Sequence, residues 1–366
     1  MVHDAELEEL GLYFPGAPFA AERLALLRYL LDQGASTADL VDYREELPGL
    51  ALVLALRLTE ALTLDELVAQ SGVEPDMVLR IIRAAGFPAP GAGERVLSPD
   101  LVHLCRLVPS AADIFGEDAI FQFVRVMGST TGRLADALVS SFLANVEPLV
   151  RDEDPVGLEV AKANTLAASL FPQVVDGLDV LLRQHLVALR RSPSPDGEDG
   201  IEVRALGVGF VDLVDSTGIA LAVPMGELGT LLTEFENVTA DAVVTAGGRV
   251  VKLIGDEVLY TAPDPVTACL IALQLTDLMA AHPRLPHVRA GVAFGEVMLR
   301  DGDVFGPVVN LAARAAKAGA PGDVVVESGL ADTAGIPSEP LGNLEVRGIG
   351  PVGLSRLTGR PVPVVT

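Results

Sequence analysis

Gly209-Phe-Val-Asp-Leu-Val-Asp-Ser-Thr217 is the first of three segments around which this chain of 366 residues is organised. The second is Gly248-Arg-Val-Val-Lys-Leu-Ile-Gly-Asp256, and the third is Asp303-Val-Phe-Gly-Pro-Val-Val-Asn-Leu-Ala-Ala-Arg314. Each segment places polar residues within an apolar run, such as Asp212 in the first and Lys252 in the second. Charged side chains are rarely left in such runs unless they are paired or bind a metal. The segments therefore indicate a functional site.

The pattern beyond residue 200 predicts alternating strands and helices. Strands are expected at 203–214, 250–254, 258–261, 288–299, 324–326, 344–346 and 354–357. Helices are expected at 225–245, 265–281 and 306–318. The order strand–helix–strand–strand–helix–strand is ferredoxin-like, and it predicts an antiparallel-rich sheet with helices on one face.

The first half of the chain has the periodicity of helices instead. Helices are expected at about 19–31, 50–62, 64–70, 75–85, 98–107, 110–114, 117–145 and 156–191. This pattern predicts an all-α domain over residues 1–191. Residues 192–200, Ser-Pro-Ser-Pro-Asp-Gly-Glu-Asp-Gly, have the composition of a linker. Residues 201–366 then form the second domain.

The charge of the chain limits its partners. Its net charge is −24, and residues 1–199 carry 31 acidic and 15 basic residues. Such a field repels phosphodiester backbones and anionic lipid heads, so neither nucleic acid nor a membrane surface is expected as a partner. The most apolar run, Leu47–Leu56, is too short to span a bilayer. Cys105 and Cys269 are expected to be free, buried thiols of a cytoplasmic protein.

One segment of the first half favours a different function. Leu62–Gly86 has the pattern of a helix-turn-helix, with Gly72 at the turn and with Arg80 and Arg83 on the second helix. A DNA-binding regulator is therefore one alternative for the chain. A helical hairpin used for packing explains the same pattern, and the acidic charge of this half favours it.

Together, the three segments resemble the signatures of class III nucleotide cyclases. These signatures are a Phe-x-Asp strand, a Lys-x-x-Gly-Asp hairpin and an Asp-x6-Asn-x3-Arg strand-to-helix segment. The tail from Val346 to Leu357 also resembles the closing hairpin of the family, so the resemblance covers about 150 residues in the right order. It implies an α+β fold: a ferredoxin-like class III nucleotide cyclase catalytic domain preceded by an all-α regulatory domain.

The resemblance also assigns metal and base contacts. Asp212 and Asp256 match the positions that hold two ions per site, Mg²⁺ or Mn²⁺. Lys252 and Asp303 match the positions that select adenine. An ammonium group can donate to a ring nitrogen of adenine, and a carboxylate can accept from its exocyclic amine.

Four more residues are considered on the same basis. Asn310 and Arg314 lie four residues apart on an expected helix and match the positions that orient the ribose and neutralise charge on the α-phosphate. Arg347 lies near a place where the family often has a triphosphate-binding cation. Asp215 stands where the family usually has glycine, and it is expected to cap the following helix.

The function implied is that of an adenylate cyclase, which converts ATP to 3′,5′-cyclic AMP and pyrophosphate. The resemblance is to bacterial two-domain enzymes of the pH-responsive type, whose helical domain can inhibit the catalytic domain. In that family each site takes its metal aspartates from one chain and its other four groups from the partner, so a homodimer is expected. A cyclase fold without catalysis, used for nucleotide binding or dimerisation, is the other alternative.

Overall fold

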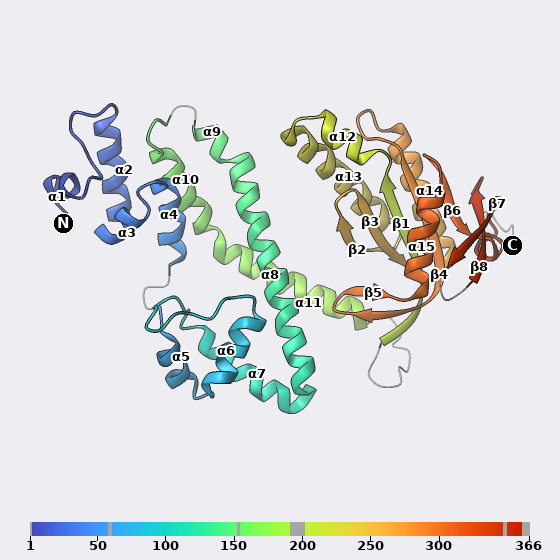
Figure 1. Cartoon of the computed structure of the whole chain (residues 1–366), viewed down its shortest axis with the longest axis horizontal. Coiled ribbons are helices and arrows are strands. Elements are labelled where there is room, and N and C mark those ends of the chain that lie inside the picture. The colour runs from blue at the N-terminus through green and yellow to red at the C-terminus, as the bar shows by residue number, and fades with distance from the viewer. Residues whose placement is uncertain (1, 58–60, 152–153, 191–201, 347–349, 361–366) are drawn as a thin grey trace. The chain divides into compact units, whose positions relative to one another are not determined.

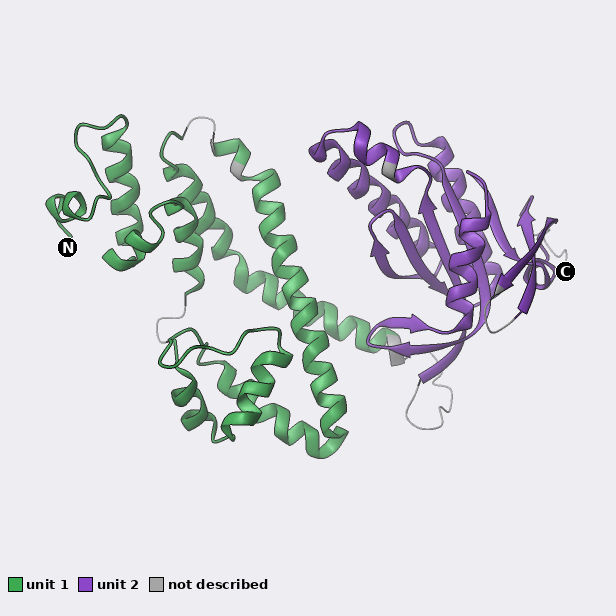
Figure 2. Cartoon of the chain, in the orientation of Figure 1, with its two compact units in different colours: residues 1–191 green, residues 192–366 purple. Residues whose placement is uncertain are grey.

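The computed structural model describes residues 2–57, 61–151, 154–190, 202–346 and 350–360. The chain divides into two compact units, Met1–Arg191 and Ser192–Thr366. Figure 1 labels their helices and strands, and Figure 2 colours the two units separately. The expected linker at 192–200 lies outside the described residues.

The first unit is built of helices. They are α1 (Asp4–Glu9), α2 (Ala20–Asp32), α3 (Thr37–Asp42), α4 (Leu47–Leu56), α5 (Leu64–Ser71), α6 (Pro75–Ala84), α7 (Leu101–Phe115), α8 (Glu117–Asn145), α9 (Glu147–Arg151), α10 (Leu158–Ser169) and α11 (Phe171–Arg190). Two separate hydrophobic clusters hold most of them together. One joins α1–α4 with α10, and the other joins α5–α8. Within the described residues, the extended pairing of this unit is a single bridge between Leu62 and Leu97.

Four expected helices of this unit had the wrong bounds. The helix expected at 50–62 ends at Leu56, because Arg57 is extended and Leu62 pairs with Leu97. The helices expected at 98–107 and 110–114 form the single helix α7, which continues through Pro109 because residues on both sides of it pack into one cluster. The long helix expected at 156–191 is instead two helices, and Pro172 falls in the first turn of the second, where proline is tolerated.

One described stretch of this unit, Leu158–Ala188, is long and apolar enough to cross a membrane. It has 31 residues and a mean hydropathy of 1.3, and 6% of its most apolar window is buried. Length and composition do not separate a membrane helix from one that packs in a core or against another protein. The expectation that the chain has no membrane span therefore remains a prediction.

The second unit combines strands and helices around one sheet. Its strands are β1 (Glu202–Leu213), β2 (Arg249–Ile254), β3 (Glu257–Ala262), β4 (Val288–Arg300), β5 (Asp303–Phe305), β6 (Val324–Glu327), β7 (Ser338–Val346) and β8 (Gly350–Leu357). Its helices are α12 (Ser216–Ala222), α13 (Met225–Thr245), α14 (Pro265–Ala281), α15 (Pro307–Ala318) and α16 (Ser328–Ala334). The strand order is β2-β3-β1-β4-β6-β8-β7, and β5 pairs with β4. Strands β4 and β6 are parallel, and the other pairs are antiparallel.

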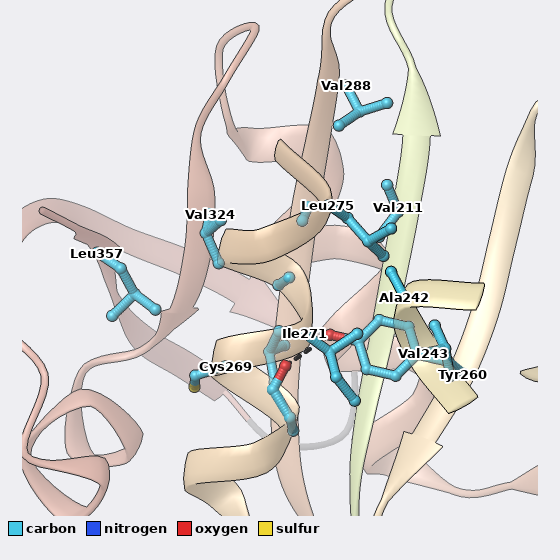
Figure 3. Packing of buried hydrophobic residues seen from close by; sticks show 14 of the residues in the cluster. Val211, Ala242, Val243, Tyr260, Cys269, Ile271, Leu275, Val288, Val324 and Leu357 are labelled. Carbon is cyan, nitrogen blue, oxygen red and sulfur yellow. Dashed lines mark hydrogen bonds between the residues drawn. The ribbon is translucent and has the colours of Figure 1, made fainter. Parts of the chain in front are cut away.

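Helices cover both faces of this sheet, so the expectation of helices on one face was wrong. Val211 and Val292 point towards α13, α14 and α16 in the larger cluster, part of which Figure 3 shows. Phe210 and Ala293, one residue away on each strand, point to the opposite face and pack with α15. Successive residues of a strand alternate between faces, which explains the two clusters. The face covered by α15 is called the α15 face below.

Candidate active site

The first two proposed site residues, Asp212 and Asp256, lie next to each other at one edge of the sheet. Asp212 is the penultimate residue of β1 and is buried. Asp256 lies in the two-residue turn between β2 and β3, where Gly255 has φ +65°, a conformation that glycine adopts without steric cost. The backbone N–H of Leu213 donates to the carbonyl of Asp256 at 3.0 Å. This bond holds the turn against the end of β1.

Asp212 belongs to a row of charged residues across three strands. Glu257 on β3 and Arg289 on β4 are its direct cross-strand neighbours, so the three side chains share the α15 face. Arg289 donates from Nε at 2.9 Å and from Nη2 at 2.6 Å to the same oxygen, Oδ2 of Asp212. The bidentate guanidinium therefore fixes the orientation of this carboxylate.

Arg289 was not among the residues predicted from the sequence. It stands as the second residue of β4, within the stretch Val288–Phe294 that is otherwise free of charge, which is the pattern that singled out Asp212 and Lys252. The signal that could have found it was therefore present. What the sequence lacked was the register that pairs Arg289 with Asp212.

Lys252 and Asp303 are brought together by the fold. Lys252 Nζ lies 2.5 Å from Asp303 Oδ2. Their side chains are 40% and 26% exposed, so the pair remains accessible to a ligand. The Asp303 carboxylate also accepts from the backbone N–H of Val304 at 2.8 Å. The neighbouring Arg249 donates to the carbonyl of Gly302 at 2.5 Å, which ties β2 to the turn before β5.

The α15 helix presents Asn310 and Arg314, both exposed, one turn apart. Arg314 donates from Nη1 to the carbonyl of Glu345 on β7 at 3.1 Å. The helix lies close against the sheet at Gly291, where a Cβ atom would lie 2.1 Å from the backbone nitrogen of Ala316. Arg347, the proposed triphosphate cation, lies outside the described residues.

Asp215 has a backbone conformation that glycine adopts without steric cost. Its φ is +60° and its ψ +32°, in the left-handed region, which aspartate tolerates better than most residues. Asp215 makes no side-chain capping bond to α12 in the described structure, so the expected cap was wrong. Its carboxylate lies over Gly218, where a Cβ atom would come within 2.6 Å of either oxygen.

The carboxylates at this edge fit a divalent cation that is shared with a nucleotide. No group of three or more His, Cys, Asp or Glu side chains suited to a metal occurs among the described residues. Mg²⁺ is usually held by one or two carboxylates together with substrate phosphates and water, which is what Asp212 and Asp256 allow. Arg289 occupies only Oδ2 of Asp212, and Oε1 of the neighbouring Glu257 is buried without a hydrogen-bond partner.

The two helices expected from the helix-turn-helix pattern are present as α5 and α6. The turn between them begins at Gly72, whose φ is +70°. The side chain of Arg80, however, is already engaged within the unit. It forms an ion pair with Glu117, and its guanidinium carbon lies 3.9 Å from the ring centroid of Phe121. These contacts favour the packing interpretation of α6.

The chain is similar over most of its length to known cyclases. No family model matches it. An adenylate cyclase from Streptomyces coelicolor is 37% identical over 264 residues, which cover 72% of this chain and 68% of that protein. A pH-sensitive adenylate cyclase from Mycobacterium tuberculosis is 28% identical over 91% of this chain and 84% of its own.

Among solved structures, the adenylyl cyclase CyaB from P. aeruginosa has a TM-score of 0.39 and 21% identity, covering 43% of this chain and 95% of its own. The adenylate cyclase from Streptomyces coelicolor is more than 30% identical to this chain and is matched over more than two thirds of its own length. With the three segments in place on the sheet, the chain belongs to the class III adenylate cyclases.

Proposed function

We propose that this enzyme converts ATP to 3′,5′-cyclic AMP and pyrophosphate at two composite sites of a homodimer. The observation that carries the proposal is the arrangement of residues on the α15 face. Asp212 pairs with Glu257 on β3, whereas Lys252 pairs with Leu259 of the same strand. Strands β1 and β2 flank β3. Asp212 and Lys252 of one chain therefore lie about 10 Å apart across the sheet and two residues apart along the strands.

The closeness of these groups within one chain supports a site completed by a second chain. Base and triphosphate lie at opposite ends of ATP, and the Lys252–Asp303 pair lies close beside the carboxylates of its own chain. Exposed apolar residues flank the proposed contacts: Leu253 and Ile254 precede the turn that carries Asp256, and Phe305 follows Asp303 on β5. Such residues are suited to an interface between two copies.

The residues at the carboxylate edge would position the reacting phosphate. Asp212 and Asp256 would hold Mg²⁺ or Mn²⁺, two ions per site, which activate the ribose 3′-hydroxyl and polarise the α-phosphate. Arg289 keeps Asp212 oriented and would add the positive charge of its guanidinium beside the triphosphate. From the partner, Arg314 would neutralise charge developing on the α-phosphate, and Asn310 would orient the ribose.

Lys252 and Asp303 would select adenine over guanine. Their mutual ion pair keeps an ammonium donor and a carboxylate acceptor side by side before any base arrives. Adenine offers a ring-nitrogen acceptor and an amine donor to such a pair, and guanine offers the opposite pattern. The arrangement supports ATP as the substrate.

A direct test is incubation of the full chain with ATP and Mn²⁺, or with ATP and Mg²⁺, followed by measurement of both products. Cyclic AMP and pyrophosphate should form in equal amounts, and GTP should be a poor substrate. Nucleotide binding without either product, with both metals, would favour the non-catalytic cyclase fold instead.

Replacing Lys252 with methionine should lower kcat/KM for ATP by about 10- to 100-fold, because a hydrogen bond from a charged group contributes about 1.5–3 kcal/mol. The preference for ATP over GTP should fall with it. Lys162→Met is the matched control, since Lys162 pairs with Glu159 on the exposed surface of α10. Unchanged discrimination between ATP and GTP in Lys252→Met would remove this residue from base selection.

The helical unit is proposed to regulate the catalytic unit. Helix α11 leads towards the catalytic unit along the chain and exposes large apolar side chains, including Leu181, Leu182 and Leu186. A row of this kind is suited to contacts that differ between an inhibited and an active state. The similarity to a pH-sensitive cyclase supports pH as the signal.

The activity of residues 200–366 alone, compared with that of the full chain, should show this regulation. We expect the isolated unit to be about 10-fold more active at the pH where the full chain is least active, since a coupling free energy of 1–3 kcal/mol is usual. Its pH profile should also be flatter. Equal activities at every pH would contradict autoinhibition.

A further inference from the structure

The row of charges beside Asp212 contains a carboxylate that the proposed chemistry does not yet use. Glu257 is the first residue of β3, the direct cross-strand neighbour of Asp212 and the residue that follows Asp256. Its side chain therefore lies on the α15 face beside one proposed metal ligand and next in sequence to the other. Arg289 bonds to Asp212 from the other side of the row.

The Glu257 carboxylate is poorly satisfied in this position. The side chain is partly buried, and its Oε1 atom has no hydrogen-bond partner in the described structure. Burial raises the pKa of Glu257, and the nearby carboxylates of Asp212 and Asp256 raise it further, while Lys317 and Arg289 lower it. A buried acceptor without a donor destabilises the fold, and more so when it is charged. We therefore expect Oε1 of Glu257 to accept a hydrogen bond from a donor that is present when the enzyme is active.

A hydrated divalent cation would bring such a donor to this place. Mg²⁺ gives up its water reluctantly and usually keeps several water molecules when it is bound by only one or two carboxylates. Groups that accept hydrogen bonds from the ligands of a metal orient those ligands and raise its affinity. Glu257 lies beside Asp212 across the strands and directly after Asp256 in the chain, so it is placed to accept a hydrogen bond from water on a cation that the two aspartates would hold.

We infer that Glu257 is a positioning residue whose buried Oε1 accepts a hydrogen bond from water on the divalent cation held by Asp212 and Asp256. The inference rests on the proposed function. It gives Glu257 a role distinct from that of the two ligands, because Glu257 acts through water rather than on the cation itself. Loss of its carboxylate should weaken metal binding by about 10-fold, the lower end of what such neighbours contribute.

The test is direct metal binding to the full chain without nucleotide. Free Mn²⁺ is counted by electron paramagnetic resonance, and Mg²⁺ is titrated in competition. We expect Glu257→Met to raise the dissociation constants of both ions by about 10-fold, and Glu257→Gln, which keeps one acceptor oxygen, to have a smaller effect. Glu296→Gln controls for the charge change, since Glu296 is exposed on β4.

Two further variants separate the explanations. In Lys317→Met, which removes the positive charge that α15 places near Glu257, metal affinity should remain within about twofold of the original. If Lys317→Met reproduced the loss, Glu257 would serve as an ion-pair partner and the inference would fail. It would also fail if both Glu257 variants bound Mn²⁺ with the same dissociation constant as the unmodified chain, once thermal melting has shown that the variants are folded. Unchanged binding in Asp256→Ala would instead overturn the proposed metal site itself.

Discussion

Replacing Asp256 with alanine is expected to lower kcat by about 1,000-fold or more, which corresponds to about 4 kcal/mol of lost transition-state stabilisation. Asp256 supplies one of the two carboxylates at the edge of β1, and within the described residues no third acid completes a metal group there. The backbone carbonyl that binds Leu213 remains in the variant, so the turn should keep its position. Cyclic AMP formation with Mg²⁺ and with Mn²⁺ measures the effect.

The matched control for this variant is Asp241→Ala. Asp241 is an exposed acid on α13, which covers the opposite face of the sheet. It should keep full activity and the same thermal midpoint as the original chain. Substantial cyclic AMP formation by folded Asp256→Ala, with either metal, would refute the assignment of Asp256 as a metal ligand.

The nearby positions of Asp212 and Asp256 show what the sequence could predict. The apolar runs 250–254 and 258–261 on either side of Gly255-Asp256-Glu257 predicted a hairpin, and the strand spacing placed both carboxylates at one edge. Helices α13 and α14 formed over the residues expected from their periodicity. These elements were predictable because local pattern and tertiary packing agree in them.

Other features depend on contacts that local pattern does not contain. The position of α15 on its own face follows from the close approach at Gly291, which a sequence pattern does not reveal. The pairing of Arg289 with Asp212 depends on the register between β1 and β4. The two residues are 77 positions apart in the chain. The short elements β5 and α16 were not expected, because a stretch of three to seven residues carries too little periodicity.

The conformation of Asp215 shows a second limit. The family resemblance indicated glycine at this position, and the charge of an aspartate suggested a cap for the helix that follows. The structure instead places Asp215 in the left-handed region without a capping bond. The preference for glycine is thus a property of the backbone, which a comparison of side-chain charges does not predict.

Mixing two inactive variants should restore activity, because each proposed site combines groups from both chains. Asp256→Ala removes one of the two proposed metal ligands of its chain, and Asn310→Ala removes a ribose contact that its chain offers to the partner. A mixed dimer contains one site with both defects and one intact site. Random pairing of equal amounts gives one half mixed dimers, so activity should return to about a quarter of that of the unmodified protein.

The control for this experiment uses two substitutions from the same set of groups. Asp212→Ala mixed with Asp256→Ala leaves a metal defect in both sites of every dimer, so activity should stay at the level of the single variants. Co-expression with different affinity tags ensures that mixed dimers form and can be isolated. Isolated mixed dimers of Asp256→Ala and Asn310→Ala that remain inactive would contradict a shared site. Restored activity in both mixtures would mean that Asp212 and Asp256 do not belong to the same chain at each site. Only a site that takes both aspartates from one chain and Asn310 from the other makes the two mixtures differ.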